Sequence, residues 1–233
     1  MSFGVIIIGG GAAGLFCAAN LSKRGIKTLV IEKNLQPGKK ILVSGGGRCN
    51  FTNLNVSAEN YASNNPHFSK SALAGFTSQD FIDLVRKHRI PFYEKKAGQL
   101  FCKNRSDDIL NLLIKECDKR FVEINTNCFV QSVRKKQDGI FKLETSKGSF
   151  ATPKLVVATG GASFPKIGGG DFGLKLAKQF GLETTVISPG LVPLRLPKIS
   201  RMTKLAGLSC TVKISTENAE FIDELLITHN GMS

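Results

Sequence analysis

The stretch that most constrains the fold is "GVIIIGGGAAGLFCAANLSKRGIKTLVIEKN", which occupies residues 4–34. The β-branched run Val5 to Ile8 predicts a fully buried strand, and residues 12–23 place apolar side chains at helical spacing. Thr28 to Ile31 predicts a second buried strand. A strand, a helix and a strand within about thirty residues form a βαβ unit, which requires a parallel sheet and a right-handed crossover. The chain is therefore expected to be an α/β protein.

The turn between the first strand and the helix has the pattern Gly9-x-Gly11-x-x-Gly14. In a dinucleotide-binding fold the first glycine permits the tight turn, the second lets a pyrophosphate approach, and the third lets helix and strand pack closely. Ala12 and Ala13 begin the helix, whose free N–H groups and positive dipole end attract phosphate. A purely structural glycine turn is the alternative. The flanking strand and helix favour a dinucleotide site.

An acidic residue, Glu32, follows the second strand, 18 residues after Gly14. A carboxylate at this position accepts hydrogen bonds from ribose hydroxyls and repels a 2′-phosphate. The nucleotide is therefore expected to be FAD or NAD and not NADP. We place the neighbouring Lys33 in the same site.

A second glycine turn, Thr159-Gly160-Gly161, follows the apolar run "KLVVA". In an open α/β sheet, ligands bind at the carboxyl ends of the strands, so we expect Thr159 and Gly160 to lie near the first turn. A simple strand-to-loop turn is the alternative. Gly168 to Gly170, before the next helix, form either a hinge or another phosphate-facing turn.

A third glycine-rich stretch is "ILVSGGGRCNFTN", residues 41–53. Gly45 to Gly47 would let the main chain pass alongside a bound cofactor, unless they form a purely structural loop. The candidate donors near the cofactor are Lys40, Ser44, Arg48 and Asn50, with Lys39 adding positive charge. Cys49 has no CxxC partner, so we expect a packed or flavin-adjacent thiol and not a catalytic one.

The remaining pattern predicts two domains, at residues 1–188 and 189–233. Helices are expected at residues 78–87, at residues 107–119 with Ser106 as the cap, and before Gly181. Strands are expected at 121–125, 129–134, 140–144 and 149–151, of which the last three form an antiparallel meander. After residue 188, prolines and strand-like stretches predict a β-rich region.

The charge balance of the chain attracts polyanions. It has 32 Lys and Arg against 18 Asp and Glu, a formal net charge of +14. Nucleic acid, an anionic membrane and a phosphate-bearing cofactor all fit such a charge, as does a solvated basic surface. The basic residues of 184–216 are dispersed and lack interleaved aromatic residues, so we do not expect a nucleic-acid partner.

Cysteine and histidine usage argues against other classes of site. Six cysteines without CxxC spacing and three scattered histidines predict neither a disulfide framework nor a metal site. The apolar run 3–19 is interrupted by Gly9, Gly10, Gly11 and Gly14 and follows no basic segment, so we expect neither a signal peptide nor a membrane helix. We expect a cytoplasmic protein.

With these pieces assembled, the chain resembles the BaiN-like, also called aminoacetone oxidase-like, FAD-dependent oxidoreductases of bacteria. The matching stretches are "IIIGGGAAGL", "GKKILVSGGGRCNFTN", "GQLFC", "VVATGG", "FGLKLAKQFG" and "LLITHNGMS". The resemblance implies a glutathione-reductase-like FAD-binding domain, with a parallel βαβ sheet and an antiparallel meander, followed by the start of an inserted β-barrel domain. Members of that family continue beyond the "LLITHNGMS" segment and return to the FAD domain, so we expect the chain to be incomplete.

The resemblance also implies a path for FAD across the domain. Gly9, Gly11 and Gly14 would face the pyrophosphate, and Glu32 the adenosine ribose. The residues that would follow the cofactor towards the flavin are Lys40, Ser44, Gly46, Gly47, Arg48 and Asn50. Val130 would contact adenine through its main chain, and Thr159 and Gly160 would form the second strand-end contact.

Two classes of function follow. The first is an FAD-dependent oxidoreductase that transfers hydride through flavin N5 and, with NADH or NADPH as donor, reduces an activated double bond or oxidises a small amine. The second is an FAD-binding protein whose basic surface docks an RNA, with the flavin serving either RNA modification or a structural role. A truncated product without activity is a third alternative. The sequence assigns no catalytic residue; Arg48 and His229 are guesses, and a structural role is favoured for His229.

Overall fold

The computed structural model describes residues 3–233 except 62, 191, 198–200 and 218–219. The chain divides into two compact units, Met1–Glu183 and Thr184–Ser233. The boundary that the sequence places between residues 188 and 189 stays a prediction.

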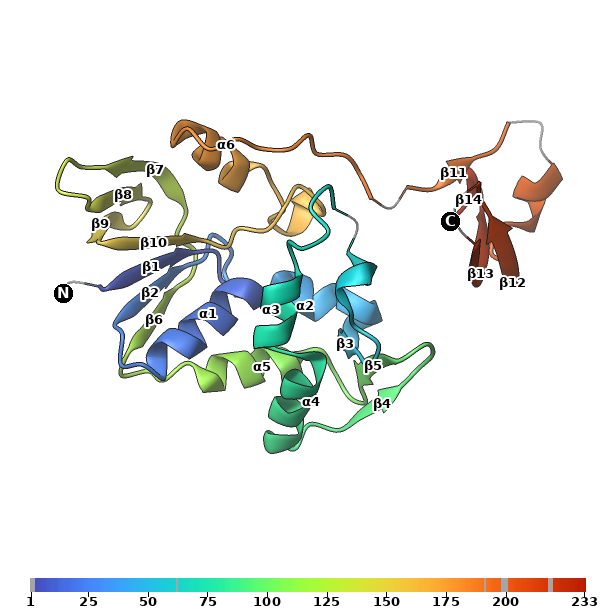
Figure 1. Cartoon of the computed structure of the whole chain (residues 1–233), viewed down its shortest axis with the longest axis horizontal. Coiled ribbons are helices and arrows are strands. Elements are labelled where there is room, and N and C mark those ends of the chain that lie inside the picture. Colours follow the sequence, from blue (N-terminus) through green and yellow to red (C-terminus); the bar gives the residue numbers. More distant parts are fainter. Residues whose placement is uncertain (1–2, 62, 191, 198–200, 218–219) are drawn as a thin grey trace. The chain divides into compact units, whose positions relative to one another are not determined.

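The first unit is built on a four-stranded parallel sheet (Figure 1). Its strands are β1 (Val5–Ile8), β2 (Thr28–Ile31), β6 (Val122–Asn125) and β10 (Lys154–Val157), in the order β10-β1-β2-β6. Helix α1 (Ala12–Ser22) joins β1 to β2, and every neighbouring pair in the sheet is parallel. The predicted βαβ unit and α/β class are therefore confirmed.

Side-chain alternation along the strands divides the core into two layers. Ile6, Ile8, Leu29 and Ile31 point to one face of the sheet, where they meet the meander and helix α6 (Phe172–Gln179). Val5, Ile7 and Val30 point to the other face and pack on α1. Because both faces are covered there, β1 and β2 are buried along their whole length, as is typical of the inner strands of a parallel sheet.

The meander also lies as the sequence predicts. Strands β7 (Val130–Lys135), β8 (Phe141–Thr145) and β9 (Gly148–Thr152) form a three-stranded antiparallel sheet. Val133 and Leu143 are buried against the central sheet. Gly181, with a φ of +73°, follows α6 at its predicted end.

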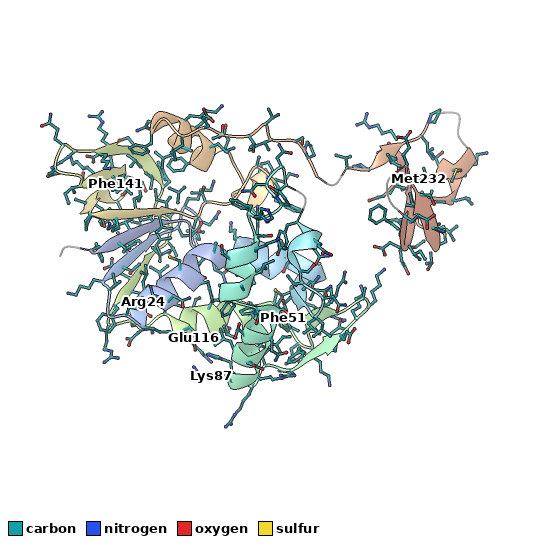
Figure 2. All side chains as sticks on the ribbon, in the orientation of Figure 1. Arg24, Phe51, Lys87, Glu116, Phe141 and Met232 are labelled. Atoms are coloured by element: carbon teal, nitrogen blue, oxygen red, sulfur yellow. The ribbon has the colours of Figure 1, made fainter. Side chains whose placement is uncertain are left out.

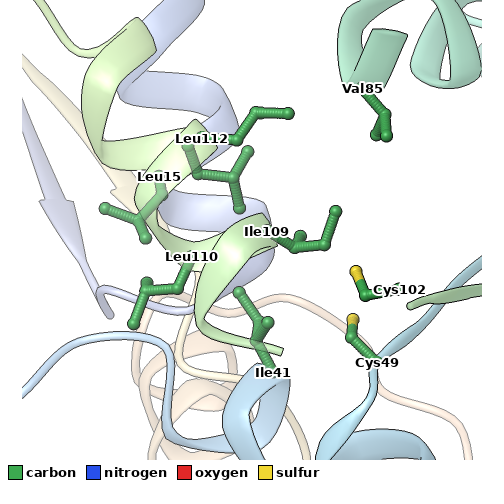
Figure 3. Close-up of a cluster of buried hydrophobic side chains, with 9 residues drawn as sticks. Leu15, Ile41, Cys49, Val85, Cys102, Ile109, Leu110 and Leu112 are labelled. Atoms are coloured by element: carbon green, nitrogen blue, oxygen red, sulfur yellow. The ribbon is translucent and has the colours of Figure 1, made fainter. Parts of the chain in front are cut away.

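A second antiparallel sheet, which the sequence does not predict, lies between residues 50 and 102. It pairs β3 (Asn50–Asn53) with β5 (Gln99–Cys102) and β5 with β4 (Phe92–Glu94). The short helices α2 (Lys39–Val43) and α3 (Lys70–Gly75) and the helix α4 (Ser78–Lys87) belong to the same part of the chain. Figure 3 shows part of the apolar cluster of this region, to which Leu15, Ile41, Cys49, Val85 and Cys102 contribute.

Two details of helix α5 (Asp107–Glu116) differ from the prediction. It ends at Glu116 and not at residue 119, because Cys117 adopts an extended backbone with ψ of 103°. The Ser106 hydroxyl does not cap the helix; it donates to the carbonyl of Leu42 at 2.7 Å and ties α5 to α2.

One carboxylate joins three helices at the edge of the first unit. Glu116 at the end of α5 accepts from Lys23 at 2.7 Å, from Lys87 at 3.4 Å and from His88 Nε2 at 2.8 Å. Glu116 and Lys87 are labelled in Figure 2. Its side chain is only 9% exposed. Burial alone would raise its pKa, but the hydrogen bonds from Lys23 and His88 and the nearby lysine charges outweigh burial and lower the pKa from 4.5 to about 2.

This ion cluster should make the unit acid-sensitive. A carboxylate with a lowered pKa stabilises the fold above its unfolded-state pKa, and that contribution is lost as the pH falls from about 4.5 towards about 2. We expect the free energy of unfolding of the wild type to fall over this range by about 3 kcal/mol more than that of Glu116→Gln. Urea denaturation at pH 6, 4 and 2.5, with Glu183→Gln as the exposed control, measures it. Parallel pH profiles for the wild type and Glu116→Gln would contradict the assignment.

The second unit is β-rich. Strands β11 (Leu194–Arg195), β12 (Ser209–Ser215), β13 (Glu220–Thr228) and β14 (Gly231–Met232) form an antiparallel sheet in the order β11-β14-β13-β12. This agrees with the strands expected after residue 188. Within the described residues, no helix is both long and apolar enough to cross a membrane.

Candidate functional site

The first glycine turn shows why two of its glycines are required by packing. Gly9 has a φ of +108°, and a Cβ there would lie 2.4 Å from the carbonyl oxygen of Ala158. A Cβ on Gly14 would lie 1.9 Å from the carbonyl oxygen of Gly9. These two glycines therefore hold β1, α1 and the segment after β10 in close contact.

Gly11 is different, because it borders open space. It is the N-cap of α1, with φ −81° and ψ −170°, and makes no side-chain cap hydrogen bond. No atom of the described residues lies within 4 Å of a Cβ built there. Ala12 and Ala13 are exposed beside it. An open backbone at a helix N-terminus fits a pyrophosphate, since N–H groups and the helix dipole both favour an anion there.

Glu32 closes one side of this turn. Its carboxylate is 7% exposed and accepts from the Gly10 N–H at 2.8 Å through Oε2, and from the Asn34 N–H at 2.8 Å through Oε1. It therefore fixes the glycine turn. Lys33 is exposed next to it.

The segment that leads into β7 lies against the same residues. The Cys128 N–H donates to the Glu32 carbonyl at 2.9 Å, and the Asn127 N–H donates to the Asn34 carbonyl at 2.8 Å. Val130, which opens β7, is thereby held near Glu32. The predicted adenine contact and the predicted ribose contact thus belong to one corner of the fold.

The turn after β10 lies close to the third glycine-rich stretch. Lys40 donates to the Ser163 hydroxyl at 3.0 Å, and its Nζ lies 3.8 Å from the Cβ position of Gly160, whose φ is +72°. The Thr159 hydroxyl is 2.9 Å from the Cβ position of Gly173, so this residue packs at the start of α6. Three of the predicted residues, Lys40, Thr159 and Gly160, are therefore brought together.

The third glycine-rich stretch is a tight loop held from both sides. Gly45, Gly46 and Gly47 all have positive φ, between +56° and +83°. A Cβ on Gly45 would meet the Phe101 ring at 2.7 Å, whereas Gly46 and Gly47 have no described atom within 4 Å of theirs. The Ser106 N–H donates to the Gly47 carbonyl at 2.9 Å. The loop thus presents open backbone at its last two glycines.

The predicted side-chain donors of this loop have partners within the protein. The Ser44 hydroxyl donates to the Ile41 carbonyl at 2.7 Å, and Arg48 Nη1 donates to the Tyr93 hydroxyl at 3.3 Å. The Asn50 amide nitrogen, in the orientation that satisfies it, donates to the carbonyls of Thr52 and Leu100. The glycine backbone is therefore what the loop offers most openly to a ligand.

A polar cavity of about 470 Å³ adjoins this loop. It is lined by Gln36, Leu42, Gly47, Arg105, Ser106 and Asp107. Of these residues, only Gly47 is among the predicted cofactor contacts. These residues come from two stretches of the chain, 36–47 and 105–107, which are far apart in the sequence.

Cys49 is a packed thiol. It is 5% exposed, and Figure 3 shows it beside Cys102, which is fully buried. Burial raises the pKa of Cys49. Burial, with the neighbouring Cys49 and Asp108, raises the pKa of Cys102 to about 12. A protonated, buried thiol is a poor nucleophile.

Thiol labelling should therefore separate the six cysteines. We expect a native-state thiol reagent to modify the exposed Cys210 first, while Cys49, Cys102, Cys117 and Cys128 react only after unfolding. Peptide mass mapping of partly labelled protein identifies each site. Fast labelling of Cys49 in the native protein would show an activated thiol and would contradict this.

No metal centre is visible in the described part of the chain, where no three His, Cys, Asp or Glu residues gather as ligands would. His229 is exposed in the turn between β13 and β14 of the second unit, and Arg48 belongs to the first unit. The structure gives neither residue a catalytic constellation.

Comparison with known proteins gives the family. Residues 3–219 match the family described as "HI0933-like protein Rossmann domain". The chain is 47% identical over 234 residues to the ribosomal RNA dihydrouridine synthase of Escherichia coli, and 43% identical over 233 residues to that of Haemophilus influenzae. It covers 58% of the length of each, although 99% and 98% of the chain is aligned.

More distant matches agree on the fold. The 3-dehydro-bile acid delta(4,6)-reductase of Clostridium scindens is 28% identical over 97% of the chain and 57% of its own length. A 3-ketosteroid-delta4-(5alpha)-dehydrogenase from Rhodococcus jostii superposes with a TM-score of 0.52 at 15% identity, over 69% of this chain and 46% of that one. A flavocytochrome c3 fumarate reductase superposes with a TM-score of 0.51 at 16% identity, over 76% and 40%.

These matches support the predicted family resemblance in part. The resemblance to the BaiN-like group is supported only at the level of the wider family, because the relatives at 47% and 43% identity carry a different name. The predicted FAD cofactor agrees with the family and with the open glycine backbone of the first unit. The chain therefore belongs to the family described as "HI0933-like protein Rossmann domain".

Proposed function

We propose that the chain takes part in the reduction of the C5–C6 double bond of uridine in ribosomal RNA, with FAD as cofactor and NADH or NADPH as electron donor. The observation that carries the proposal is 47% identity, over 99% of the chain, to an enzyme named ribosomal RNA dihydrouridine synthase. Because the chain spans 58% of that relative, the activity is assigned to the protein by similarity and not by a complete site.

The chemistry joins the two functions that the sequence leaves open. The C5–C6 bond of uracil is conjugated to a carbonyl group, so it is an activated double bond, and here the substrate is an RNA. The relative at 28% identity is named a delta(4,6)-reductase of a 3-dehydro-bile acid, which is again reduction of a carbon–carbon double bond. This replaces the expectation that nucleic acid is not a partner. It also favours double-bond reduction over the oxidation of a small amine.

The proposed cofactor site uses the residues that the structure brings together. Gly11, Ala12 and Ala13 would bind the pyrophosphate at the start of α1, and Glu32 would accept from the ribose. The main chain of Val130 would contact adenine.

The rest of the cofactor would follow the third glycine-rich stretch. Gly46 and Gly47 leave room for it along the main chain, and Lys40, Thr159 and Gly160 would border it from the turn after β10. Bound FAD supplies hydride transfer between a nicotinamide and the substrate.

The overall reaction balances with one donor and one proton. NADH or NADPH supplies a hydride, which is two electrons and one hydrogen, and water or a protein acid supplies the second hydrogen as a proton. Uridine becomes dihydrouridine and the nicotinamide is oxidised. No residue is assigned as the proton donor, because the described residues show no acid placed for that role.

A direct assay tests the proposal. In vitro transcribed ribosomal RNA, which contains no modified uridine, is incubated with the protein, FAD and NADPH without oxygen, and its nucleosides are separated by mass. We expect a uridine species heavier by two hydrogens, absent when NADPH is omitted or when FAD has first been removed from the protein. NADPH oxidation with a small enone but no dihydrouridine in the RNA would overturn the RNA assignment and favour a small-molecule reductase.

A further inference from the structure

The small sheet β3-β5-β4 has an outer face of unusual composition. Cys102 lies opposite Phe92 in the antiparallel register, and its N–H is 3.4 Å from the Cys49 carbonyl oxygen; all three side chains belong to the apolar cluster. Side chains alternate along a strand, so Tyr93 and Phe101, which form the next opposed pair, point to the other face. Lys95 and Lys103 lie two residues further along and share that outer face.

This part of the chain is strongly basic. Residues 86–105 contain seven Lys and Arg and one acidic residue, Glu94. The seven, all exposed, are Arg86, Lys87, Arg89, Lys95, Lys96, Lys103 and Arg105. Across the described residues, no carboxylate lies within 4.0 Å of Lys95 or Lys103, whereas Arg86, Lys87 and Arg105 each have an acidic neighbour. The positive charge of the outer face is therefore not neutralised locally.

Aromatic rings accompany these cations. Tyr93 and Phe101 stack with centroids 6.0 Å apart and an interplanar angle of 28°. Lys95 Nζ lies 5.5 Å from the centre of the Phe101 ring, and Arg48 Nη1 is 3.3 Å from the Tyr93 hydroxyl. Phe101 is buried, at 8% exposed, so the half-buried Tyr93 is the ring of this pair that a ligand can reach. Cations beside an aromatic ring on a sheet face are typical of proteins that bind single-stranded nucleic acid, since phosphates meet the cations and bases stack on the ring.

The outer face leads directly to the proposed cofactor site. Gly45 packs on the Phe101 ring, and the Cys102 N–H donates to the Arg48 carbonyl at 3.0 Å. Gly46 and Gly47, the open glycines, therefore stand at the edge of the same face. Arg105 lines the cavity beside Gly47. An RNA strand on this face could present a base at the glycine loop.

We propose that the outer face of β3-β5-β4, defined by Arg48, Tyr93, Lys95 and Lys103, binds a single-stranded segment of the RNA substrate. This inference rests on the proposed function, because that function makes RNA the partner. Lys95 and Lys103 bind the backbone, Tyr93 contributes the aromatic surface, and Arg48 joins this face to the glycine loop.

The test removes two charges from this face and two from a matched place elsewhere. The double variant Lys95→Gln/Lys103→Gln is compared with Lys135→Gln/Lys136→Gln on the meander. Lys135 is an equivalent control because its Nζ also lies 5.5 Å from an aromatic centre, that of Phe141. Binding of a fluorescent single-stranded ribosomal RNA fragment is measured by anisotropy at several salt concentrations, with FAD content and NADPH-driven flavin reduction measured alongside.

We expect the Lys95/Lys103 variant to bind at least about tenfold more weakly and to lose about 1.4 from the slope of log affinity against log salt. The Lys135/Lys136 variant should change affinity less than about twofold, and FAD content should be the same in all proteins. Equal weakening by both variants, or none by either, would overturn the docking face.

The proposed function and the docking face fail in different ways. If the wild type makes dihydrouridine while both double variants bind RNA like the wild type, the docking face is wrong and the function stands. If RNA binding depends on Lys95 and Lys103 but no dihydrouridine forms, the docking face stands and the proposed reaction is wrong.

Discussion

Gly11→Asp is expected to abolish FAD binding while leaving the fold as stable as the wild type or more so. Gly11 is the N-cap of α1 and has an extended backbone that any residue can adopt. Aspartate is a favoured N-cap and interacts well with the helix dipole, so the helix gains a cap that it lacks. The same carboxylate occupies the open space at Gly11 and repels a pyrophosphate.

The expected loss of FAD affinity is at least about a hundredfold. The aspartate carboxylate and the pyrophosphate are both negative, and two like charges placed side by side in a binding site destabilise the complex by several kcal/mol. FAD titration followed by flavin fluorescence measures it, and thermal unfolding of the apoprotein checks stability. Gly190→Asp adds the same charge at an exposed position outside the first unit and should bind FAD normally. Unchanged FAD affinity in Gly11→Asp would show that the cofactor does not use this turn.

Gly14→Ala is expected to have the opposite profile, a large loss of stability from one added methyl group. The new Cβ would lie 1.9 Å from the carbonyl oxygen of Gly9 and 3.1 Å from its carbonyl carbon. Neither atom belongs to a flexible side chain, so α1 must move away from β1. That movement disrupts the packing of Ala18 and Ala19 on Val5 and Ile7.

We expect Gly14→Ala to destabilise the first unit by about 3 kcal/mol or more. For a chain of this size the melting temperature should fall by about 6 to 12 °C. Gly11→Ala adds the same methyl group where no described atom lies within 4 Å, and should melt within about 2 °C of the wild type. A wild-type melting temperature for Gly14→Ala would mean that helix and strand are not in this contact.

Local periodicity was sufficient to predict the central sheet and the meander. The strands around Ile7, Val30 and Val156 are short apolar runs bounded by glycine or charge. The meander and α6 pack on one face of their sheet, and α1 packs on the other. The strands of the meander are separated by turns at residues 137–139 and 147–148. These patterns depend on neighbours in sequence, which is why they could be read without a structure.

The sheet β3-β5-β4 could not be predicted in the same way. Its strands have three or four residues, and the register shifts between Asn50 and Thr52. It therefore shows no regular alternation. Its basic outer face is also hidden in sequence, because Arg48 and Tyr93 are 45 residues apart and meet only through the sheet.

The candidate site shows a similar division. Gly9 and Gly14 make the close backbone contacts that the dinucleotide pattern predicts, because that pattern encodes backbone geometry. The side-chain donors Ser44 and Asn50 hydrogen-bond instead to nearby carbonyl groups, which residue type alone does not show. Sequence reasoning recognises which glycines are needed more reliably than which polar side chains remain available.

The central claim is that the first unit holds a flavin that a nicotinamide can reduce. The most direct test is an anaerobic visible spectrum of the protein, purified and supplied with FAD, before and after addition of NADPH or NADH. We expect a yellow protein that retains FAD through desalting and loses its colour when the nicotinamide is added. A colourless protein that takes up no FAD would contradict the account.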